Sequence, residues 1–439
     1  MITRTSVAVV GGGPSGIAAA SALKAGGVDC ILLEKSHMLG SRWASKDLVT
    51  HSPVYDALKL NNSSGRMSYP RNPLARWRPY SYQSASHFRQ YLERSAERSL
   101  PFHTVRLGTR VARISPDVDK ASMSKWSVEC DNGDIISCNY VVLASGLTAV
   151  PVVPTDFETH PSLTHSAQYL NASKHHGRRV LVVGAGNSGA DIACDLAQQE
   201  DIEVDISCGS SVRVVPRALW KFPLDRLDGP LNSRLPLWMR NLFHEIMIFP
   251  TTQRAKALGL TARGGRLLDD GWTISSALVP LMQKRRIKLR PRACRAEGSV
   301  VTFSDGTTRA YDDVIMATGY APSFPALPAD LPISAVKNEC FRKIVPCDPS
   351  LRGVFVCGAV FPLGPLLQTV SAQAGWITRV VQTGIDPLSL PSVEDELRFR
   401  RSKAPTLLVD PYPYTRLLQS DMALMNSRIG AYSEESTSG

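Results

Sequence analysis

The chain has 439 residues, of which 43% are apolar and 20% charged. This balance excludes a disordered, collagen-like or purely coiled-coil protein, and the length predicts two or three domains. Lys and Arg outnumber Asp and Glu by 50 to 39, which gives a formal net charge of +11. A basic surface suits nucleic acid or a polyanionic cofactor. Because the basic residues are scattered and form no compact patch with aromatic residues, nucleic-acid binding is the weaker alternative.

The cysteines and the apolar segments limit the compartment and the cofactors. Nine cysteines occur at irregular spacing and none forms a C-x-x-C pair, so we expect no zinc ribbon, no redox dithiol and no metal. Free thiols are typical of a reducing compartment. The N-terminus lacks a signal-peptide pattern, and no run of about 18 apolar residues predicts a transmembrane helix. We therefore expect a cytoplasmic protein with no membrane partner.

A first dinucleotide-binding signature begins at the N-terminus. An apolar strand pattern at 6–10 precedes Gly11-Gly-Gly13-Pro14-Ser15-Gly16, and an alanine-rich helical stretch, a strand at 30–33 and Glu34 follow. The three glycines permit a tight turn, close approach of a pyrophosphate and close packing of helix on strand, while the acid accepts hydrogen bonds from a ribose. With the strand before it and the acid after it, the motif strongly predicts dinucleotide binding.

A second signature of the same kind lies near the middle of the chain. A strand pattern at 180–183 leads into Gly184-Ala-Gly186-Asn187-Ser188-Gly189, and another strand follows at 204–207. No acid closes this strand, where Cys208-Gly209 stands instead. A missing carboxylate favours NADP over NAD, because nothing repels the ribose 2′-phosphate and Arg commonly accommodates it. Arg213 and Arg217 are candidates for this contact, although either is equally typical of a solvated loop.

Strand patterns that end in glycine indicate how the two signatures are combined. Such patterns occur at 141–146, 313–320 and 354–358, and hairpin patterns at 127–136 and 300–309 precede the first two. We predict an α/β protein with two Rossmann-like dinucleotide-binding domains, the second inserted in the first. The first domain is expected to consist of two parts, 1–155 and 319–400. The second domain is expected at 156–318, with a helical excursion at 218–272. A C-terminal tail should follow at 401–439 and fray from 433.

Five further segments carry a family resemblance. They are Glu34-Lys35 with Gly40-Ser41-Arg42-Trp43, Tyr55-Asp-Ala-Leu-Lys-Leu60-Asn61-Asn62, Ala317-Thr318-Gly-Tyr320, Gly364 to Trp376, and Tyr412-Pro-Tyr414 with Leu417-Leu418. In these segments the chain resembles the flavin-containing monooxygenases, the class B single-component type that includes the YUCCA-like enzymes. Ser41 replaces a glycine and Leu60 replaces a threonine of the family pattern. The resemblance covers most of the chain.

Two departures from the family pattern bear on the activity. The fingerprint Phe-x-Gly-x-x-x-His-Ser-x-x-Tyr is half present: His165-Ser166 and Tyr169 fit, but Thr159 and Pro161 stand at the Phe and Gly positions. Baeyer–Villiger enzymes of this class carry Trp at the position of Tyr169, which favours the hydroxylating branch. Gly209-Ser210 replaces the arginine that usually contacts the 2′-phosphate, so NADH remains an alternative to NADPH as the cofactor.

The resemblance implies an enzyme in which NADPH reduces FAD and O2 then forms a C4a-hydroperoxyflavin that oxygenates the nitrogen or sulfur of a small molecule. It implies that FAD binds through Gly11, Gly13, Pro14, Ser15, Gly16, Glu34, Lys35, Arg42, Trp43, Leu60, Asn62 and Gln373. It implies that the nicotinamide cofactor binds through Gly184, Gly186, Asn187, Ser188, Gly189, Ser207, Arg213 and Thr318. The cofactors carry the redox chemistry, and the protein positions them and excludes water.

Asn61 is the expected catalytic residue, because an amide can donate a hydrogen bond near the flavin without exchanging a proton at neutral pH. Taken alone, the Asn-rich run there favours an Asx-turn or cap, and only the family resemblance reverses this interpretation. Gln373 and Thr369 either touch the flavin ring or lie on a solvated helix face. Arg42 either contacts FAD phosphate or lies at the surface, and Trp43 either covers the cofactor or fills the core. His165 is more typical of a structural histidine that orients the linker than of a proton shuttle.

Other functions remain open at this level. Baeyer–Villiger or oxidative-decarboxylating monooxygenases share the class, and a ferredoxin-reductase-like electron transferase shares the paired dinucleotide units. A non-catalytic FAD-binding sensor is a third alternative, disfavoured by the intact glycines. The excursion around Trp220 to Trp272 is apolar, aromatic and basic. That composition suits a hydrophobic or anionic substrate, or equally the interface of a homodimer.

Overall fold

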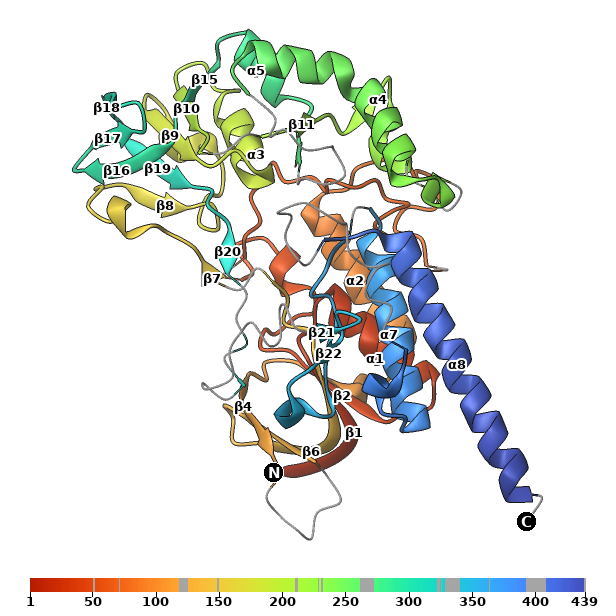
Figure 1. Ribbon diagram of the computed structural model, residues 1–439. Coiled ribbons are helices and arrows are strands. Elements are labelled where there is room, and N and C mark those ends of the chain that lie inside the picture. Colours follow the sequence, from red (N-terminus) through yellow and green to blue (C-terminus); the bar gives the residue numbers. More distant parts are fainter. Residues whose placement is uncertain are drawn as a thin grey trace.

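The computed structural model describes residues 1–49, 52–70, 72–117, 125–147, 150–209, 212–227, 229, 232–260, 272–321, 324, 326–327, 340–362, 364–391 and 408–437. These residues form two sheets built largely from parallel strands, one toward each end of the molecule (Figure 1). The observed architecture is thus mixed α/β, as the alternation of strand and helix patterns predicts.

The larger sheet has seven strands in the order β3-β2-β1-β6-β5-β4, and β23 pairs with β6 beside β5. Its strands are β1 (Ile2–Val10), β2 (Cys30–Leu33), β3 (Val105–Arg106), β4 (Val111–Pro116), β5 (Trp126–Cys130), β6 (Ile135–Leu143) and β23 (Val354–Val356). Strands β3, β2, β1, β6 and β23 run parallel, whereas β5 pairs in antiparallel orientation with both β6 and β4. The hairpin predicted at 127–136 is confirmed by β5 and β6.

Four helices stand beside this sheet: α1 (Pro14–Ala25), α2 (Ala85–Ser99), α7 (Leu366–Thr383) and α8 (Pro411–Thr437). Helix α1 packs between α2 and α7, and α8 packs on the outer side of α7 (Figure 1). Their apolar side chains join one face of β1 in a single core that includes Val7, Val9 and Trp376. The predicted C-terminal tail is therefore largely a helix, and residues 433–437, expected to fray, continue it.

The smaller sheet has five strands, all parallel, in the order β15-β10-β9-β19-β8. They are β8 (Leu163–His165), β9 (Arg179–Val183), β10 (Glu203–Ser207), β15 (Ile287–Arg290) and β19 (Asp313–Met316). Helices α3 (Asn187–Leu196) and α5 (Leu278–Gln283) contribute to its core. A three-stranded antiparallel sheet of β16 (Ala293–Glu297), β17 (Val300–Phe303) and β18 (Thr308–Ala310) lies beside it and confirms the second predicted hairpin.

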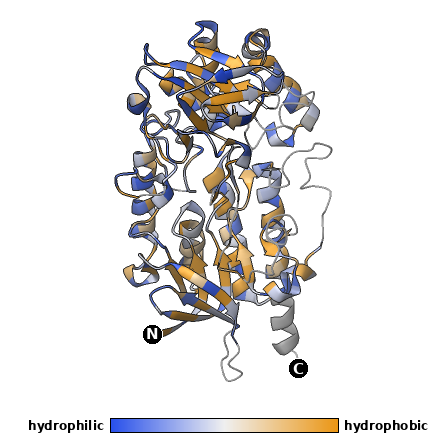
Figure 2. Ribbon diagram, turned by 90° about the vertical axis from the view of Figure 1, so that its left-hand side faces the viewer, coloured by the Kyte–Doolittle hydropathy of each residue, from blue (hydrophilic) through white to orange (hydrophobic). Residues whose placement is uncertain are grey.

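The chain passes between the two sheets through two segments that lie together. Strand β7 (Val150–Pro151) leads to the smaller sheet and β20 (Tyr320–Ala321) leads back, and the two pair in antiparallel orientation. The smaller sheet is thus formed by a continuous stretch of chain between two parts of the larger one. Figure 2 shows apolar residues concentrated on the strands of both sheets, as expected where both faces of a sheet are buried.

The predicted helical excursion at 218–272 is helical only in part. It opens with a hairpin of β12 (Ala218–Leu219) and β13 (Phe222–Pro223), and its helix α4 (Leu237–Ala257) follows. Strands β11 (Val214–Val215) and β14 (Thr273–Ile274) pair at its two ends. Among the described residues, no helix combines the length and the apolar content needed to cross a membrane.

The remaining short elements connect these parts. They are β21 (Cys340–Phe341), β22 (Val345–Pro346), β24 (Phe361–Pro362), β25 (Leu408–Val409) and the 3-10 turns Ser41–Trp43, Phe102–Thr104, Thr155–Phe157, Ala172–His175, Leu224–Arg226, Asn232–Arg234, Pro349–Leu351 and Pro387–Ser389.

Candidate functional site

The first glycine motif forms the turn between β1 and α1. Gly11 has φ +111°, and a Cβ there would lie 2.7 Å from the carbonyl oxygen of Ala144 at the end of β6. A Cβ at Gly16 would lie 1.8 Å from the carbonyl oxygen of Gly11, so the helix must pack directly on the turn. Gly13, the N-cap of α1, would meet nothing within 4 Å. The outer glycines are therefore required by packing, and the middle glycine faces open space.

The second glycine motif repeats this geometry between β9 and α3. A Cβ at Gly184, whose φ is +107°, would lie 2.5 Å from the carbonyl oxygen of Ala317, and one at Gly189 would lie 1.9 Å from that of Gly184. Gly186 caps α3 and again would meet nothing within 4 Å. Both motifs thus leave the free N–H groups of a helix N-terminus accessible to an anionic group, as a pyrophosphate site requires.

Glu34 lies at the end of β2, beside the first glycine turn. Its buried carboxylate accepts hydrogen bonds from Gly12 N (2.6 Å), Ser36 N (2.9 Å) and Ser41 Oγ (3.3 Å). These bonds fix the carboxylate next to the motif in the place where a ribose of a bound dinucleotide lies. The first motif and its acid together fit a dinucleotide such as FAD.

The side chains of the family segment after Glu34 lie in different environments. Lys35 is exposed. The Arg42 guanidinium lies 5.8 Å from the centre of the Tyr320 ring, and burial lowers the pKa of Arg42. Trp43 is partly buried, packs edge-to-face on Phe88 at 4.8 Å and lies against the core beside β1. Arg42 thus connects the first glycine unit to the returning linker strand.

Gln373 holds three parts of the chain together. It is fully buried on α7, its Oε1 accepts a hydrogen bond from Gly358 N (2.8 Å), and its Nε2 donates to Tyr414 Oη on α8 (2.7 Å). The turn that it holds lies against the first motif, because a Cβ at Gly358 would lie 2.0 Å from Ser15 Oγ. Pro14 is fixed similarly, by a hydrogen bond from Tyr69 Oη to its carbonyl oxygen (2.6 Å). Thr369 donates to the carbonyl oxygen of Pro365 (2.8 Å).

Residues 61–63 are held by three different parts of the molecule. Asn61 Oδ1 accepts a hydrogen bond from Arg217 Nη2 (3.1 Å), and Asn62 Nδ2 donates to the carbonyl oxygen of Gly364 (2.9 Å). Ser63 N donates to Asp225 Oδ2 (2.6 Å). Leu60, directly before them, is buried in the core beside β1. The segment that carries the expected catalytic amide therefore lies where the larger sheet, the smaller sheet and the excursion meet.

Arg217 joins this segment to the helix of the second glycine motif. Its Nη2 also lies 3.1 and 3.2 Å from the two carboxylate oxygens of Asp191 on α3, and Tyr55 Oη donates to the same carboxylate (2.9 Å). Burial raises the pKa of Asp191, and the positive charge of Arg217 opposes that rise. The structure therefore places Arg217 between the sheets, engaged with Asp191 and Asn61.

The other residues expected to bind the nicotinamide cofactor lie around the second motif. Ser207 is buried, and its hydroxyl donates to the carbonyl oxygen of Pro291 (2.7 Å) and accepts from Ala293 N (2.8 Å). Asn187 Oδ1 accepts from Ile274 N (2.7 Å), whereas Ser188 is partly exposed on the first turn of α3. Thr318 donates to the carbonyl oxygen of Val152 in the neighbouring linker.

Arg213 lies in a different ion pair from Arg217. Its Nη1 is 3.4 Å from Glu245 Oε1 on α4, and its side chain is largely buried. The two arginines that the sequence offers for a 2′-phosphate are thus both committed to carboxylates elsewhere.

His165 and Tyr169 of the half-present fingerprint orient the returning linker. His165 Nε2 is 3.1 Å from the carbonyl oxygen of Gly319, and burial lowers the pKa of this histidine. Tyr169 Oη donates to Asp195 Oδ2 on α3 (2.5 Å). These contacts agree with the interpretation of His165 as a structural residue.

Sequence reasoning missed Asp191 and Asp225. Asp191 stands two residues after the last glycine of the second motif, so its place near the N-terminus of α3 was readable, but its partners were not. Asp225 lies in a 3-10 turn of the excursion, where no motif marks it. Among the described residues, no group of three His, Cys, Asp or Glu side chains is arranged to hold a metal ion.

Comparison with known proteins defines the class. The family model described as "Flavin-binding monooxygenase-like" matches residues 4–410, so the chain belongs to this family. It is 28% identical to indole-3-pyruvate monooxygenase YUCCA1 of Oryza sativa subsp. japonica, over 72% of this chain and 77% of that protein. It is 27% identical to flavin-containing monooxygenase 3 of Rattus norvegicus, over 89% and 76%. The protein is therefore a flavin-binding monooxygenase, an enzyme of the kind that the sequence resemblance implies.

Solved structures share the fold. A flavin-containing monooxygenase from Stenotrophomonas maltophilia superimposes with a TM-score of 0.61 at 20% identity, and the match covers 87% of this chain and 99% of that one. An oxidized steroid monooxygenase bound to NADP gives a TM-score of 0.71 at 15% identity, with coverage of 96% and 98%. The arrangement of two sheets is thus common to monooxygenases of different substrates.

Proposed function

We propose that the protein binds FAD at the first glycine motif and NADPH at the second, and uses O2 to oxygenate the nitrogen or sulfur of a small molecule. The observation that carries this proposal is the duplicated turn, in which the middle glycine alone would tolerate a Cβ without meeting protein atoms. When bound, the flavin supplies hydride acceptance and oxygen activation. The steroid monooxygenase bound to NADP supports the choice of nicotinamide cofactor.

The residues of the first unit would hold the flavin dinucleotide. The N–H groups at the start of α1 would bind its pyrophosphate, and Glu34 would accept from a ribose hydroxyl. In the second unit the start of α3 would bind the nicotinamide pyrophosphate. We propose the same domain boundaries as the sequence suggests. Residues 1–155 and 319–400 would form the flavin-binding domain, 156–318 the domain that binds the nicotinamide cofactor, and 401–439 the C-terminal tail. The cytoplasm is the compartment proposed.

Asn61 would direct its amide toward the reacting groups. Its oxygen accepts from Arg217, which fixes the orientation of the amide plane. Within the described part of the chain its Nδ2 has no hydrogen-bond partner, so these two N–H groups are available to a ligand. A donor held in advance stabilises developing negative charge without reorganisation.

A second candidate is a Baeyer–Villiger-type oxygenation of ketones. The solved cyclohexanone monooxygenase matches 96% of this chain with a TM-score of 0.68, which is a closer overlay than that of the Stenotrophomonas enzyme. Tyr169 supports the first proposal, since it fits the fingerprint of the hydroxylating branch. Product analysis after incubation with amines, sulfides and ketones distinguishes the two.

The central test uses one variant in each glycine motif. Gly13→Ala and Gly186→Ala place a methyl group in open space, so both variants are expected to fold. We expect Gly13→Ala to lower the FAD content of the purified protein about tenfold or more, because the methyl group obstructs the approach of the pyrophosphate. Gly186→Ala should stay yellow and bleach more slowly with NADPH in the absence of O2.

Each variant is the control for the other. Unfolding temperature shows that both are folded, and O2 uptake with each substrate class measures oxygenation. A wild-type protein that is colourless and takes up no FAD would overturn the proposal, as would flavin binding that is indifferent to Gly13→Ala.

A further inference from the structure

The end of β10 is the part of the second unit that decides between NADPH and NADH. In a Rossmann unit the ribose of the adenosine lies at the end of the second strand, where an acid binds the 2′-hydroxyl of NAD or an arginine accommodates the 2′-phosphate of NADP. Here β10 ends at Ser207, and Cys208 and Gly209 follow. No acid occupies these positions, and neither does an arginine.

An arginine reaches this place from a loop that follows another strand. Arg292 lies between β15 and β16, and a Cβ built on Gly209 would be 3.1 Å from its Cγ and 3.3 Å from its Cδ. The aliphatic stem of Arg292 therefore lies against the backbone of Gly209. A side chain at 209 would displace it, so glycine at this position makes room for the arginine.

The loop that carries Arg292 is fixed to the end of β10. Ser207 Oγ donates to the carbonyl oxygen of Pro291 (2.7 Å) and accepts from Ala293 N (2.8 Å), so the residues on both sides of Arg292 are bound to one buried hydroxyl. The carbonyl oxygen of Arg292 accepts from Ser304 N (2.8 Å). Ser207 thus acts on the cofactor site by positioning this loop.

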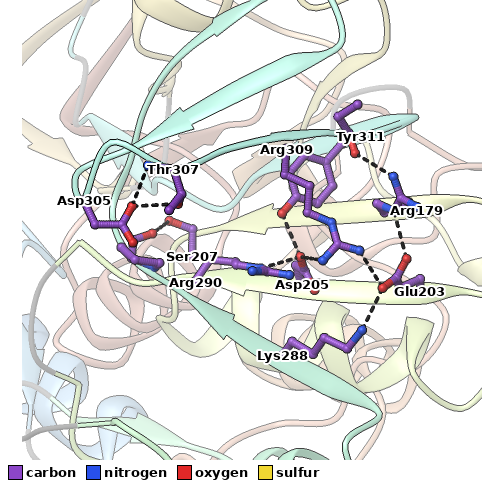
Figure 3. A network of polar contacts seen from close by, with 12 residues as sticks. Arg179, Glu203, Asp205, Ser207, Lys288, Arg290, Asp305, Thr307, Arg309 and Tyr311 are labelled. Atoms are coloured by element: carbon purple, nitrogen blue, oxygen red, sulfur yellow. Dashed lines mark hydrogen bonds and ion pairs between the residues drawn. The ribbon is translucent and has the colours of Figure 1, made fainter.

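The other cations near this strand are each paired with a carboxylate. Arg290 donates to Asp205 Oδ2 (2.7 Å), and Asp205 is fully buried and also within 3.5 Å of Arg309 (Figure 3). Arg213 pairs with Glu245, and Arg217 with Asp191. In the described ranges Arg292 is exposed and its guanidinium has no carboxylate partner, so its charge is available to a ligand.

We infer that Arg292 binds the 2′-phosphate of the nicotinamide cofactor and makes the enzyme prefer NADPH. This inference rests on the proposed binding of a nicotinamide dinucleotide at the second glycine motif. A guanidinium presents paired N–H donors that match a phosphate, and a charge-assisted bond of this kind is about twice as strong as a neutral one. The sequence lacks an arginine at 209–210, and Arg292 takes over its role from the loop between β15 and β16.

The experiment measures equilibrium binding of NADP+ and of NAD+ to the oxidised, FAD-loaded protein by titration calorimetry. We expect Arg292→Ala to weaken NADP+ binding about 10- to 100-fold, the loss of a hydrogen bond to a charged group, and to change NAD+ binding less than about twofold. Arg292→Lys should fall between, because it retains the charge without the paired donors.

Arg295→Ala is the matched control, since Arg295 is an exposed arginine on the adjoining strand that pairs with Glu297 (3.3 Å). It should leave both affinities unchanged. An equal loss of both nucleotides in Arg292→Ala, or no loss of either, would overturn the inference while leaving the proposed function intact. If the wild type binds neither nucleotide, the proposed function itself fails and the inference falls with it.

Discussion

At the scale of single residues, the orientation of one amide is set by a contact across the molecule. Asn61 belongs to the larger sheet's part of the chain, whereas Arg217 lies between β11 and the excursion. The same guanidinium nitrogen, Nη2, also donates to Asp191, which helps to fix its position. The carboxylate balances the charge of the arginine in a place where burial would otherwise make it costly.

This contact predicts that Arg217→Lys separates binding of the flavin from its productive use. A lysine keeps the charge beside Asp191, but its ammonium group is carried on a different stem and does not reproduce the position of Nη2, the atom through which Arg217 contacts both Asp191 and Asn61. We expect the FAD content to stay at the wild-type level and oxygenated product per NADPH to fall about tenfold, the equivalent of one hydrogen bond of about 1.4 kcal/mol. Product and hydrogen peroxide are measured together.

Asn61→Ala should give the same loss of coupling, and the double variant should lose little more than either single variant if Arg217 acts through Asn61. Arg352→Lys is the control, because that arginine forms an exposed pair with Asp386. Unchanged product yield in Asn61→Ala would remove Asn61 from the site.

At the scale of elements, a network of charges fastens β10 to its neighbours. Glu203 accepts from Arg179 on β9 (2.8 Å), Lys288 on β15 (2.8 Å) and Arg309 on β18 (2.6 Å) (Figure 3). The hydrogen bond from Lys288, followed by that from Arg179, lowers the pKa of Glu203 from 4.5 to about 2. One carboxylate on β10 thus binds residues of three other strands, two in the same sheet and one in the adjoining sheet.

The pKa of Glu203 predicts the direction of the pH dependence. In the unfolded chain this carboxyl group binds a proton more readily, so the stability it contributes is complete above about pH 4.5 and is lost as the pH falls through 2. We expect Glu203→Gln to flatten the decline of the unfolding free energy between about pH 5 and about pH 3. Urea unfolding at each pH measures it.

Glu297→Gln, which removes only an exposed pair with Arg295, should leave the shape of the wild-type curve unchanged. If Glu203→Gln also leaves the shape unchanged, the network has no part in acid stability.

At the scale of the whole molecule, the excursion connects the two sheets. Asp225 accepts from Ser63 N (2.6 Å), and its carbonyl oxygen accepts from Arg66 Nε (3.0 Å). Arg226 donates to the carbonyl oxygen of Pro79 (3.3 Å). These contacts attach the excursion to the segment that carries Asn61, so the placement of the excursion helps to determine the shape of the candidate site.

We predict that Asp225→Ala loosens this segment selectively. Loss of the hydrogen bond to Ser63 N should speed amide exchange at residues 61–66 about fivefold, since a single bond contributes about 1 kcal/mol. Hydrogen exchange with mass spectrometry measures it, and peptides from β9 serve as the internal reference.

Asp348→Ala is the matched control, because Asp348 accepts a similar bond from Ser350 N (2.9 Å) far from the site. It should change exchange near residue 350 only. Equal exchange at 61–66 in the wild type and Asp225→Ala would show that the excursion does not restrain the segment.

The sequence by itself determined what local chain geometry dictates. The two glycine turns, Glu34 at the end of its strand and both hairpins were predicted correctly, because positive φ, the start of a helix and the alternation of buried residues are encoded within a few neighbouring positions. The family segments indicated the monooxygenase class through their resemblance to the flavin-containing monooxygenases. The whole excursion at 218–272 was predicted as helical; α4 confirms this for Leu237–Ala257, whereas a hairpin of β12 and β13 stands at its start.

Only the tertiary structure decided which side chains meet. Gln373, expected at the flavin or in solvent, is buried between Gly358 and Tyr414, and Arg217, expected at a phosphate, lies between Asp191 and Asn61. Arg292 reaches Gly209 from 83 positions later in the chain. Such contacts depend on how sheets and helices pack, and packing is determined by the whole chain, so no local pattern contains them.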